Sequence, residues 1–167
     1  MNKNAYCLQA DIYMLSGLAQ KADPLRLSIK IYNMNEIKNE NLKIKNDKEK
    51  FKKEFKLRIY NWSLDLVKLI DALSKDSVSK VISNQLIRSG TSVGANYVEA
   101  QAASSKKDFI KFIHYCLKSA NECKFWLCLL KDTNRSGEKQ IERLLNEIVE
   151  ISNIFGSSLL TLKGKRN

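Results

Sequence analysis

The chain has 167 residues, and its 29 lysines and arginines against 18 aspartates and glutamates give a formal charge of +11. A chain of this length can bury the core of one domain without disulfides or metal ions. The single proline and a hydrophobic content of 44% favour long helices over an all-β fold. The charge favours a polyanionic partner, but lysine excess also follows from AT-rich genome composition and does not establish one.

The cysteines and the apolar runs exclude several classes of protein. Cys7, Cys116, Cys123 and Cys128 contain no C-x-x-C pair, and the last three lie among core-type residues of one stretch. We therefore expect reduced packing residues with no metal and no disulfide. No secretory signal and no apolar run long enough for a bilayer is present, so we expect a cytoplasmic protein without membrane contact.

The sequence also carries no recognisable catalytic pattern. It has no Gly-rich phosphate loop, no serine nucleophile motif and no pair of carboxylates spaced for acid–base work. The only histidine, His114, is too far along one predicted helix from Cys123 and Cys128 to activate either thiol. We expect neither enzymatic activity nor a cofactor.

Residues 1–46 carry patterns that point to different structures. Residues 5–22 fit a short amphipathic helix, whereas residues 25–31 alternate between apolar and polar side chains as in a strand. The Asn- and Lys-rich segment 33–50 is typical of a linker or of the frayed start of the next helix. We therefore treat residues 1–46 as an extension and linker that is either disordered or, because Met34 is an alternative start, misannotated.

The first helix of the main domain is predicted over residues 47–74. Its apolar residues recur at alternating steps of four and three, which places them on one helical face. The members of this stripe are Phe51, Phe55, Ile59, Trp62, Leu66, Leu69 and Leu73. A second apolar stripe lies beside the first and suggests a subunit contact. Its members are Leu57, Tyr60, Leu64 and Val67.

The second helix is predicted from Asp76 or Ser77, either of which can cap it, to about Ala103. It carries few charges, which indicates burial on more than one side. Gly90 and Gly94 each cost about 1 kcal/mol in a helix interior relative to alanine, so a close helix contact is expected to offset them. A helix broken at Gly90 is the alternative. We predict that Gly94→Leu disrupts packing or assembly.

Two further helices complete the domain. Ser105 and Asp108 have capping-box spacing and open the third helix, whose apolar stripe runs from Phe109 to Leu130. A polar turn at residues 131–137 precedes the fourth helix. The apolar stripe of that helix consists of Ile141, Leu145, Ile148, Ser152, Phe155, Leu159 and Leu162. Four such helices with short connections predict an antiparallel up-down-up-down four-helix bundle over residues 47–163, with a basic tail at 164–167.

This topology gathers positive charge at one end of the bundle, where the first helix starts, the second meets the third, and the fourth ends. Twelve basic residues lie there against four acidic ones. The basic residues are Lys48, Lys50, Lys52, Lys53, Lys56, Arg58, Lys106, Lys107, Lys111, Lys163, Lys165 and Arg166. We predict a polyanion site at this end; the alternative is a solvated lysine-rich surface.

The residues themselves also resemble a known family. Residues 85–100 contain the pattern Q-L-x-R-S-x-T-S-x-x-A-N-x-x-E, followed by Lys107-Asp108-Phe109 and by A-N-E-C-K-F-W-L at 120–127. These motifs resemble the 23S rRNA intervening-sequence protein family of bacteria, also called four-helix bundle proteins, over about residues 52–162. The resemblance implies an antiparallel four-helix bundle that assembles as a ring-shaped homopentamer. The family has no established activity.

The chain also looks similar to a relative of this family, the accessory variability determinant of diversity-generating retroelements. That similarity implies a basic pentameric protein that is a partner of a reverse transcriptase and its nucleic acid. The present chain departs from the usual family pattern at Gly90 and Gly94, where other small residues are common, and at Ala100, where a glycine often follows the glutamate. Its N-terminal extension leaves the shape of one end of any ring open.

Two sets of residues follow from these patterns. Phosphate contact is predicted for Lys52, Lys53, Lys56, Lys106 and Lys107. A structural role at helix or subunit contacts is predicted for Arg88, Gly90, Gly94, Asn96 and Glu99. The predicted function is that of a non-enzymatic homo-oligomer that binds RNA or DNA backbone without reading sequence. The alternative is a scaffold that docks another protein, such as a polymerase, and binds no nucleic acid.

Overall fold

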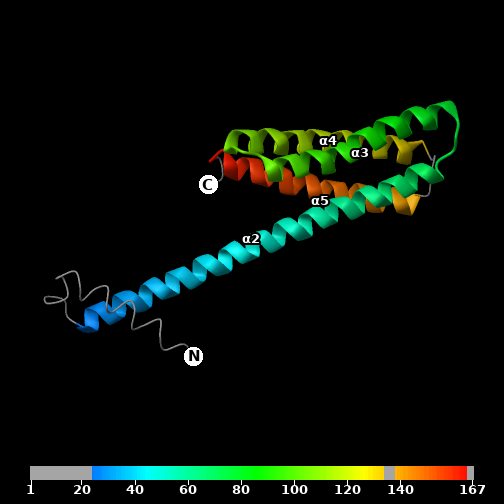
Figure 1. Ribbon diagram of the computed structural model, residues 1–167. Helices are drawn as coiled ribbons and strands as arrows, with labels where there is room; N and C mark the ends of the chain where they lie inside the picture. The colour runs from blue at the N-terminus through cyan, green and yellow to red at the C-terminus, as the bar shows by residue number, and fades with distance from the viewer. Residues whose placement is uncertain (1–23, 134–137, 165–167) are drawn as a thin grey trace. The chain divides into compact units, whose positions relative to one another are not determined.

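The computed structural model describes residues 24–133 and 138–164. This part of the chain forms four α-helices and no strand (Figure 1). The helices are α2 (Pro24–Ala72), α3 (Ser77–Ala102), α4 (Lys106–Asp132) and α5 (Glu138–Leu162). None of them, over the described residues, is both long enough and apolar enough to cross a bilayer. The predicted helix at 5–22, part of the polar turn and the last residues of the basic tail lie outside the described residues.

The chain divides between Lys50 and Phe51 into two compact units. In the first unit, the predicted strand at 25–31 and the helix start at Asp47 are both wrong, because α2 is helical from Pro24 onward. Proline suits the first turn of a helix, where its missing N–H group would have no partner. A single strand would leave its backbone groups unpaired, whereas a helix pairs them internally. The side chains from Ser28 to Lys50 are exposed.

The second unit is the predicted antiparallel bundle. Leu66 of α2 lies beside Gly90 of α3, and the thiol of Cys116 in α4 donates to the Val93 carbonyl of α3 over 3.6 Å. Further contacts join α4 to α5 through Lys124 and Ser152, at 3.0 Å, and α5 to α2 through the Trp62–Leu144 hydrogen bond described below. A second contact in each pair of helices gives the direction, because a higher number on one helix meets a lower number on the other. These second contacts are Gly94 with Ile59, Cys123 with Ser89, Lys131 with Glu142, and Arg58 with Glu147. They confirm the up-down-up-down order.

The predicted apolar stripes form the core, with a few exceptions. Buried side chains follow the alternating steps of four and three on α2 from Phe55 to Leu69, then at Leu73 just beyond the end of α2, and again on α4. Phe51 is an exception because it is exposed and stacks on the ring of Phe55, with the ring centroids 5.7 Å apart. On α5, Leu144 is buried instead of Leu145, which is half-buried. The second stripe of α2 is exposed.

Helix α3 is continuous through both central glycines, so the alternative of a break at Gly90 is wrong. A Cβ atom added at Gly90 would lie 2.1 Å from Leu66 Cδ2, far inside contact distance. At Gly94 the nearest atom would be Ile59 Cγ2 at 3.7 Å, an ordinary contact. The close approach of the two helices therefore occurs at Gly90, where only the absence of a side chain permits it.

Of the two caps predicted for α3, Asp76 is the N-cap and Ser77 is the first helical residue, and the predicted cap of α4 at Ser105 is confirmed. Asp76 caps α3, and its carboxylate accepts hydrogen bonds from the Val78 and Ser79 amides at 3.0 Å. Ser105 caps α4, and its hydroxyl oxygen accepts from the Asp108 amide at 3.1 Å while the hydroxyl donates to the Asp108 carboxylate at 2.6 Å. These bonds satisfy amides that have no acceptor within their own helix.

Candidate nucleic-acid interface

An aromatic cluster packs three helices together at the end of the bundle where positive charge was predicted. Phe55 of α2, Tyr97 of α3 and Phe155 of α5 meet with ring centroids 5.2 to 6.0 Å apart. Burial raises the pKa of the Tyr97 phenol to about 12. The cluster holds one α2 segment beside the end of α3 and the end of α5, which is the arrangement that the topology predicts.

Two of the predicted phosphate ligands share one pocket at this end. The pocket has a volume of about 400 Å³ and is open to solvent. Lys52 approaches it from α2 and Lys106 from the first position of α4. The remaining lining residues come from the α3–α4 connection and its flanks: Ala100, Gln101, Ala103, Ser104, Ser105 and Phe109. The pocket is therefore lined by two lysines and lies at a helix N-terminus.

The N-terminus of α4 adds its own electrostatics to this pocket. The first amides of a helix carry partial positive charge and attract anions. Asp108 partly offsets this field, because its carboxylate lies in the first turn and is held by Ser105. Lysines at the first two positions face an unfavourable dipole, so they do not stabilise α4. An anion in the pocket would relieve their repulsion from the helix end.

The other three predicted phosphate ligands, Lys53, Lys56 and Lys107, are exposed but do not line the pocket. Lys56 follows Lys52 by one helical turn and shares its side of α2. Lys53 lies on a different side of the same turn, since successive helical residues are about 100° apart. The predicted set is thus split, with Lys52 and Lys106 together and the others around them.

The charge at this end is lower than the sequence count suggests. Arg58, one of the twelve basic residues predicted at this end, forms a double hydrogen bond with Glu147 and a further one with Glu150, both on α5. The hydrogen bond to Glu147 raises the pKa of the guanidinium, so it remains charged and paired. Arg58 is therefore a structural residue. Lys163 is exposed, and Lys165 and Arg166 lie outside the described residues.

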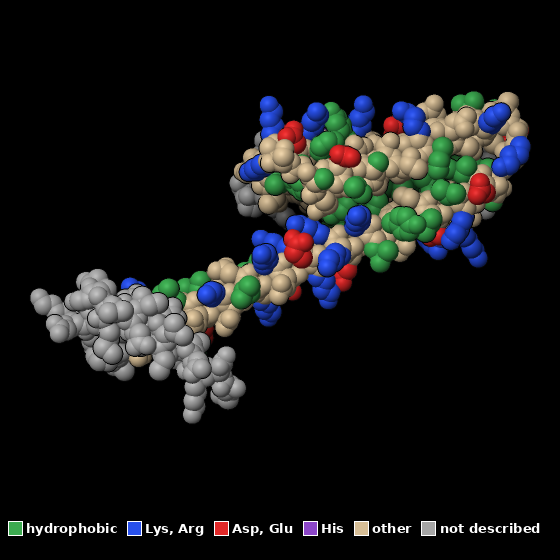
Figure 2. Space-filling view, viewed as in Figure 1, with side chains coloured by type: hydrophobic (Ala, Val, Ile, Leu, Met, Phe, Trp, Pro, Cys, Tyr) green, Lys and Arg blue, Asp and Glu red, His purple; other side chains and the backbone are tan. Residues whose placement is uncertain are grey.

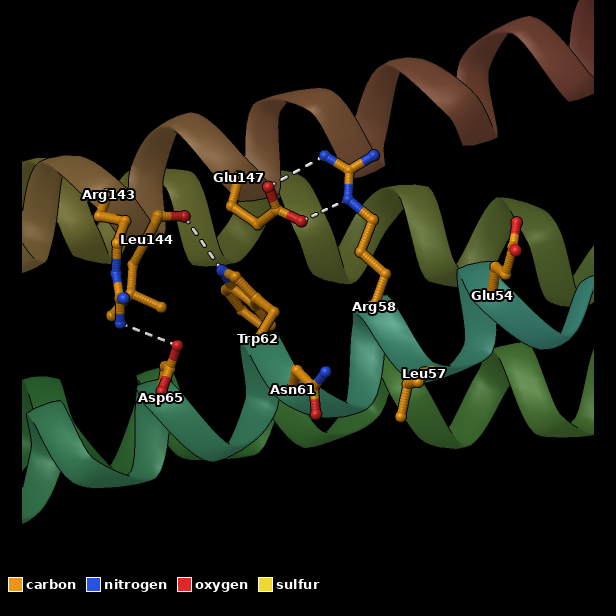
Figure 3. A pocket seen from close by; sticks show the side chains of 9 residues that line it. All are labelled: Glu54, Leu57, Arg58, Asn61, Trp62, Asp65, Arg143, Leu144 and Glu147. Carbon is orange, nitrogen blue, oxygen red and sulfur yellow. Dashed lines mark hydrogen bonds and ion pairs between the residues drawn. The ribbon is translucent and has the colours of Figure 1, made fainter. Parts of the chain in front are cut away.

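A second pocket, between α2 and α5, was not found from the sequence (Figure 3). It has a volume of about 460 Å³, and Trp62 lies at its base with its indole N–H donating to the Leu144 carbonyl (Figure 3). Arg143 crosses it to Asp65 at 2.8 Å. Because its arginines are already paired with carboxylates, the groove offers little free charge to a ligand. Among the described residues no group of acids, histidines or cysteines is arranged to hold a metal ion.

The structural motif residues have separate roles. Arg88 joins α3 to α4 through Glu122 at 2.5 Å and is steadied by Gln85 on its own helix. The Asn96 amide donates to the Ser92 carbonyl one turn back, at 2.8 Å. Glu99 is exposed and forms no hydrogen bond or ion pair with the rest of the described chain. Among Arg88, Asn96 and Glu99, it is Arg88 that contacts another helix through a charged group.

The described cysteines are free thiols in two different environments. Cys116 and Cys123 are buried in α4, and burial raises the pKa of each thiol to about 12. The Cys123 thiol donates to the Ser89 hydroxyl over 3.3 Å. Cys128 is exposed. The two buried thiols are packing groups and not nucleophiles, because the thiolate is the reactive form.

This difference predicts selective labelling of the folded protein. In a Cys7→Ser background, a thiol reagent such as dithionitrobenzoate at pH 8 is expected to modify Cys128 rapidly, and Cys116 and Cys123 only after unfolding in urea. Mass spectrometry of tryptic peptides identifies the labelled site. Rapid modification of Cys116 or Cys123 without urea would contradict the packing described for α4.

Comparison with known proteins gives consistent results. A family model described as 23S rRNA-intervening sequence protein matches residues 55–157, more than half of the chain. The chain is also similar to a solved structure described as a protein with unknown function from the S23 ribosomal protein family of Bacteroides thetaiotaomicron VPI-5482, at 36% identity and a TM-score of 0.59. That similarity covers 63% of this chain and 97% of the other. None of the curated proteins compared with the chain matches it.

Proposed function

Since the chain belongs to the 23S rRNA-intervening sequence protein family, we propose that it is a non-enzymatic homo-oligomer that binds RNA or DNA backbone without reading sequence. The observation that carries this proposal is the pocket at the N-terminus of α4, where Lys52 and Lys106 converge. Phosphate is the anion that such a combination of ammonium groups and helix amides suits. Its setting would be the cytoplasm.

The chemistry of the pocket favours backbone over base recognition. Lysine is a flexible point charge, and contacts to phosphate fix position without carrying sequence information. The pocket is open to solvent, and the side chains that line it between the two lysines are mostly small. A base edge would find few fixed donors and acceptors there. Affinity should therefore depend on salt much more than on sequence.

Self-association is proposed through the second apolar stripe of α2. Leu57 and Tyr60 are 57% and 60% exposed, and Leu64 and Val67 lie one and two turns further along the same helix with about two fifths of their surface exposed. Figure 2 shows apolar side chains reaching the surface of the bundle between charged ones. A second copy of this chain is the proposed occupant, in the pentameric ring that the family resemblance implies. A closed ring would repeat the lysine pocket around one axis.

A protein scaffold is the second candidate, and the same apolar stripe favours it. In that case the stripe would receive another protein, such as a polymerase or reverse transcriptase, and the lysines would be solvated. Salt separates the two functions, because phosphate binding by several lysines weakens steeply with salt whereas an apolar interface hardly responds.

The deciding experiment compares two double variants of equal charge change. Lys52→Glu and Lys106→Glu are combined in one protein, and Lys75→Glu and Lys80→Glu, from the opposite end of the bundle, are combined in the control. Fluorescence anisotropy with a labelled RNA at 50 mM salt is expected to show at least about tenfold weaker binding for the first variant only. Light scattering of each protein gives its oligomer mass.

The possible results separate the candidates. Equal binding by both variants would remove the pocket from the proposal. A wild-type protein that ignores RNA at low salt while keeping its oligomer mass would overturn nucleic-acid binding and leave the scaffold. A monomeric wild type would overturn the proposed self-association.

A further inference from the structure

The outward face of α4 carries a row of basic side chains that the core pattern does not explain. Lys107, Lys111, His114 and Lys118 recur at steps of four, three and four, so they lie on one face of the helix. The same steps continue to Asn121 and Phe125. All six side chains are exposed, and none is acidic. In Figure 2, Lys and Arg side chains stand out along the edge of the bundle where α3 and α4 lie.

The carboxylates nearest to this row on α4 are already engaged. Asp108 is held by Ser105, and Glu122 pairs with Arg88 of α3. Within the described part of the chain, Lys107, Lys111 and Lys118 form no ion pair. Lys111 has its ammonium group 5.9 Å from the centroid of the Tyr115 ring. The three lysines of the row therefore have no counter-charge paired with them within the described chain.

The row starts beside the lysine pocket and ends at an aromatic side chain. Lys107 follows Lys106 directly, and the distance from Lys107 to Lys118 along the axis is about 16 Å at 1.5 Å per residue. Phe125 is 59% exposed, and its ring rests edge-on against Trp126 with the centroids 4.9 Å apart. An exposed ring that is held in place in this way is a surface on which a base can stack.

We infer that the outer face of α4 is a track for single-stranded nucleic acid, with phosphates along Lys107, Lys111 and Lys118 and an unpaired base stacked on Phe125. This inference rests on the proposed function and specifies its ligand. Sequence-tolerant single-strand binding combines a basic path with aromatic platforms in this manner. The bases of a duplex are stacked inside the helix, so a duplex could use the lysines but not Phe125.

The test separates the lysines of the track from its aromatic end. Three variants are compared: a double variant with Lys111→Gln and Lys118→Gln, the single variant Phe125→Ala, and a control with Lys75→Gln and Lys80→Gln. Each is titrated by fluorescence anisotropy against labelled oligo-dT, oligo-U and a duplex of equal length. All the substituted side chains are exposed, so the core stays unchanged. The melting temperature of each variant verifies that it folds. Salt is varied from 50 to 200 mM.

The lysine variant is expected to lower the slope of log affinity against log salt by about 1.4 on single strands, since each phosphate contact contributes about 0.7. Phe125→Ala is expected to weaken single-strand binding about fivefold or more and to leave duplex binding unchanged. The control should match the wild type.

Failure of the track is distinguishable from failure of the proposed function. If the Lys111/Lys118 variant keeps the wild-type slope while the Lys52/Lys106 variant loses binding, the α4 track is wrong and the pocket stands. If Phe125→Ala affects duplex and single strand equally, or neither, the single-strand assignment is wrong. A wild-type protein that binds no nucleic acid at 50 mM salt overturns both.

Discussion

Trp62→Ala is expected to lower the free energy of unfolding by about 3–5 kcal/mol, the usual cost of removing a large buried aromatic side chain. Trp62 is only 2% exposed and fills the space between α2 and α5. Its indole N–H donates to the Leu144 carbonyl at 3.0 Å, which ties the two helices together. Urea denaturation followed by circular dichroism at 222 nm measures the loss.

Trp62→Phe is the matched control for this variant. Phenylalanine keeps most of the apolar contact but cannot donate to Leu144, so its cost should be closer to the value of one buried hydrogen bond plus a small void, about 1–2 kcal/mol. If the free energy of unfolding of the Trp62→Ala protein were within about 1 kcal/mol of the wild-type value, the packing of α2 against α5 would be contradicted.

The core of the bundle was largely predictable because burial depends on helical period. Steps of four and three place Phe55, Ile59 and Leu66 on one face whatever the partner helix is, and these residues are buried. The caps were equally local, since Ser105 and Asp108 interact within one turn. Phe51 fits the same period but is exposed, because period predicts a face and not how far along it the partner helices extend.

The candidate site was less predictable because it depends on the register between helices. Arg58 is one of the twelve basic residues that the sequence places at this end, and only its position opposite Glu147 on α5 shows that it is paired. Likewise, Lys52 of α2 and Lys106 of α4 are far apart in sequence, and only the arrangement of the helices shows that they line the same pocket. The row from Lys107 to Lys118 repeats at the same steps of three and four as the core stripes. A search for this period among the charged residues could therefore have found the row from the sequence.

Gly90→Ala should destabilise the protein although alanine is the better helix former. The added Cβ would lie 2.1 Å from Leu66 Cδ2, and Leu66 is fully buried, so its methyl group has no free space to move into. Overpacking of this kind costs about 1–3 kcal/mol, against a gain of about 1 kcal/mol in helix propensity. We therefore expect a net loss of stability in thermal and urea unfolding.

Gly94→Ala provides the control, because it makes the same chemical change one turn further along α3. Its Cβ would lie 3.7 Å from Ile59 Cγ2, an ordinary contact, so the propensity gain of up to about 1 kcal/mol should remain. The two substitutions should thus change stability in opposite directions. Leu66→Ala should cost less in the Gly90→Ala background than alone, since the new methyl group fills part of the cavity. Additive losses in that cycle would show that Gly90 and Leu66 are not in contact.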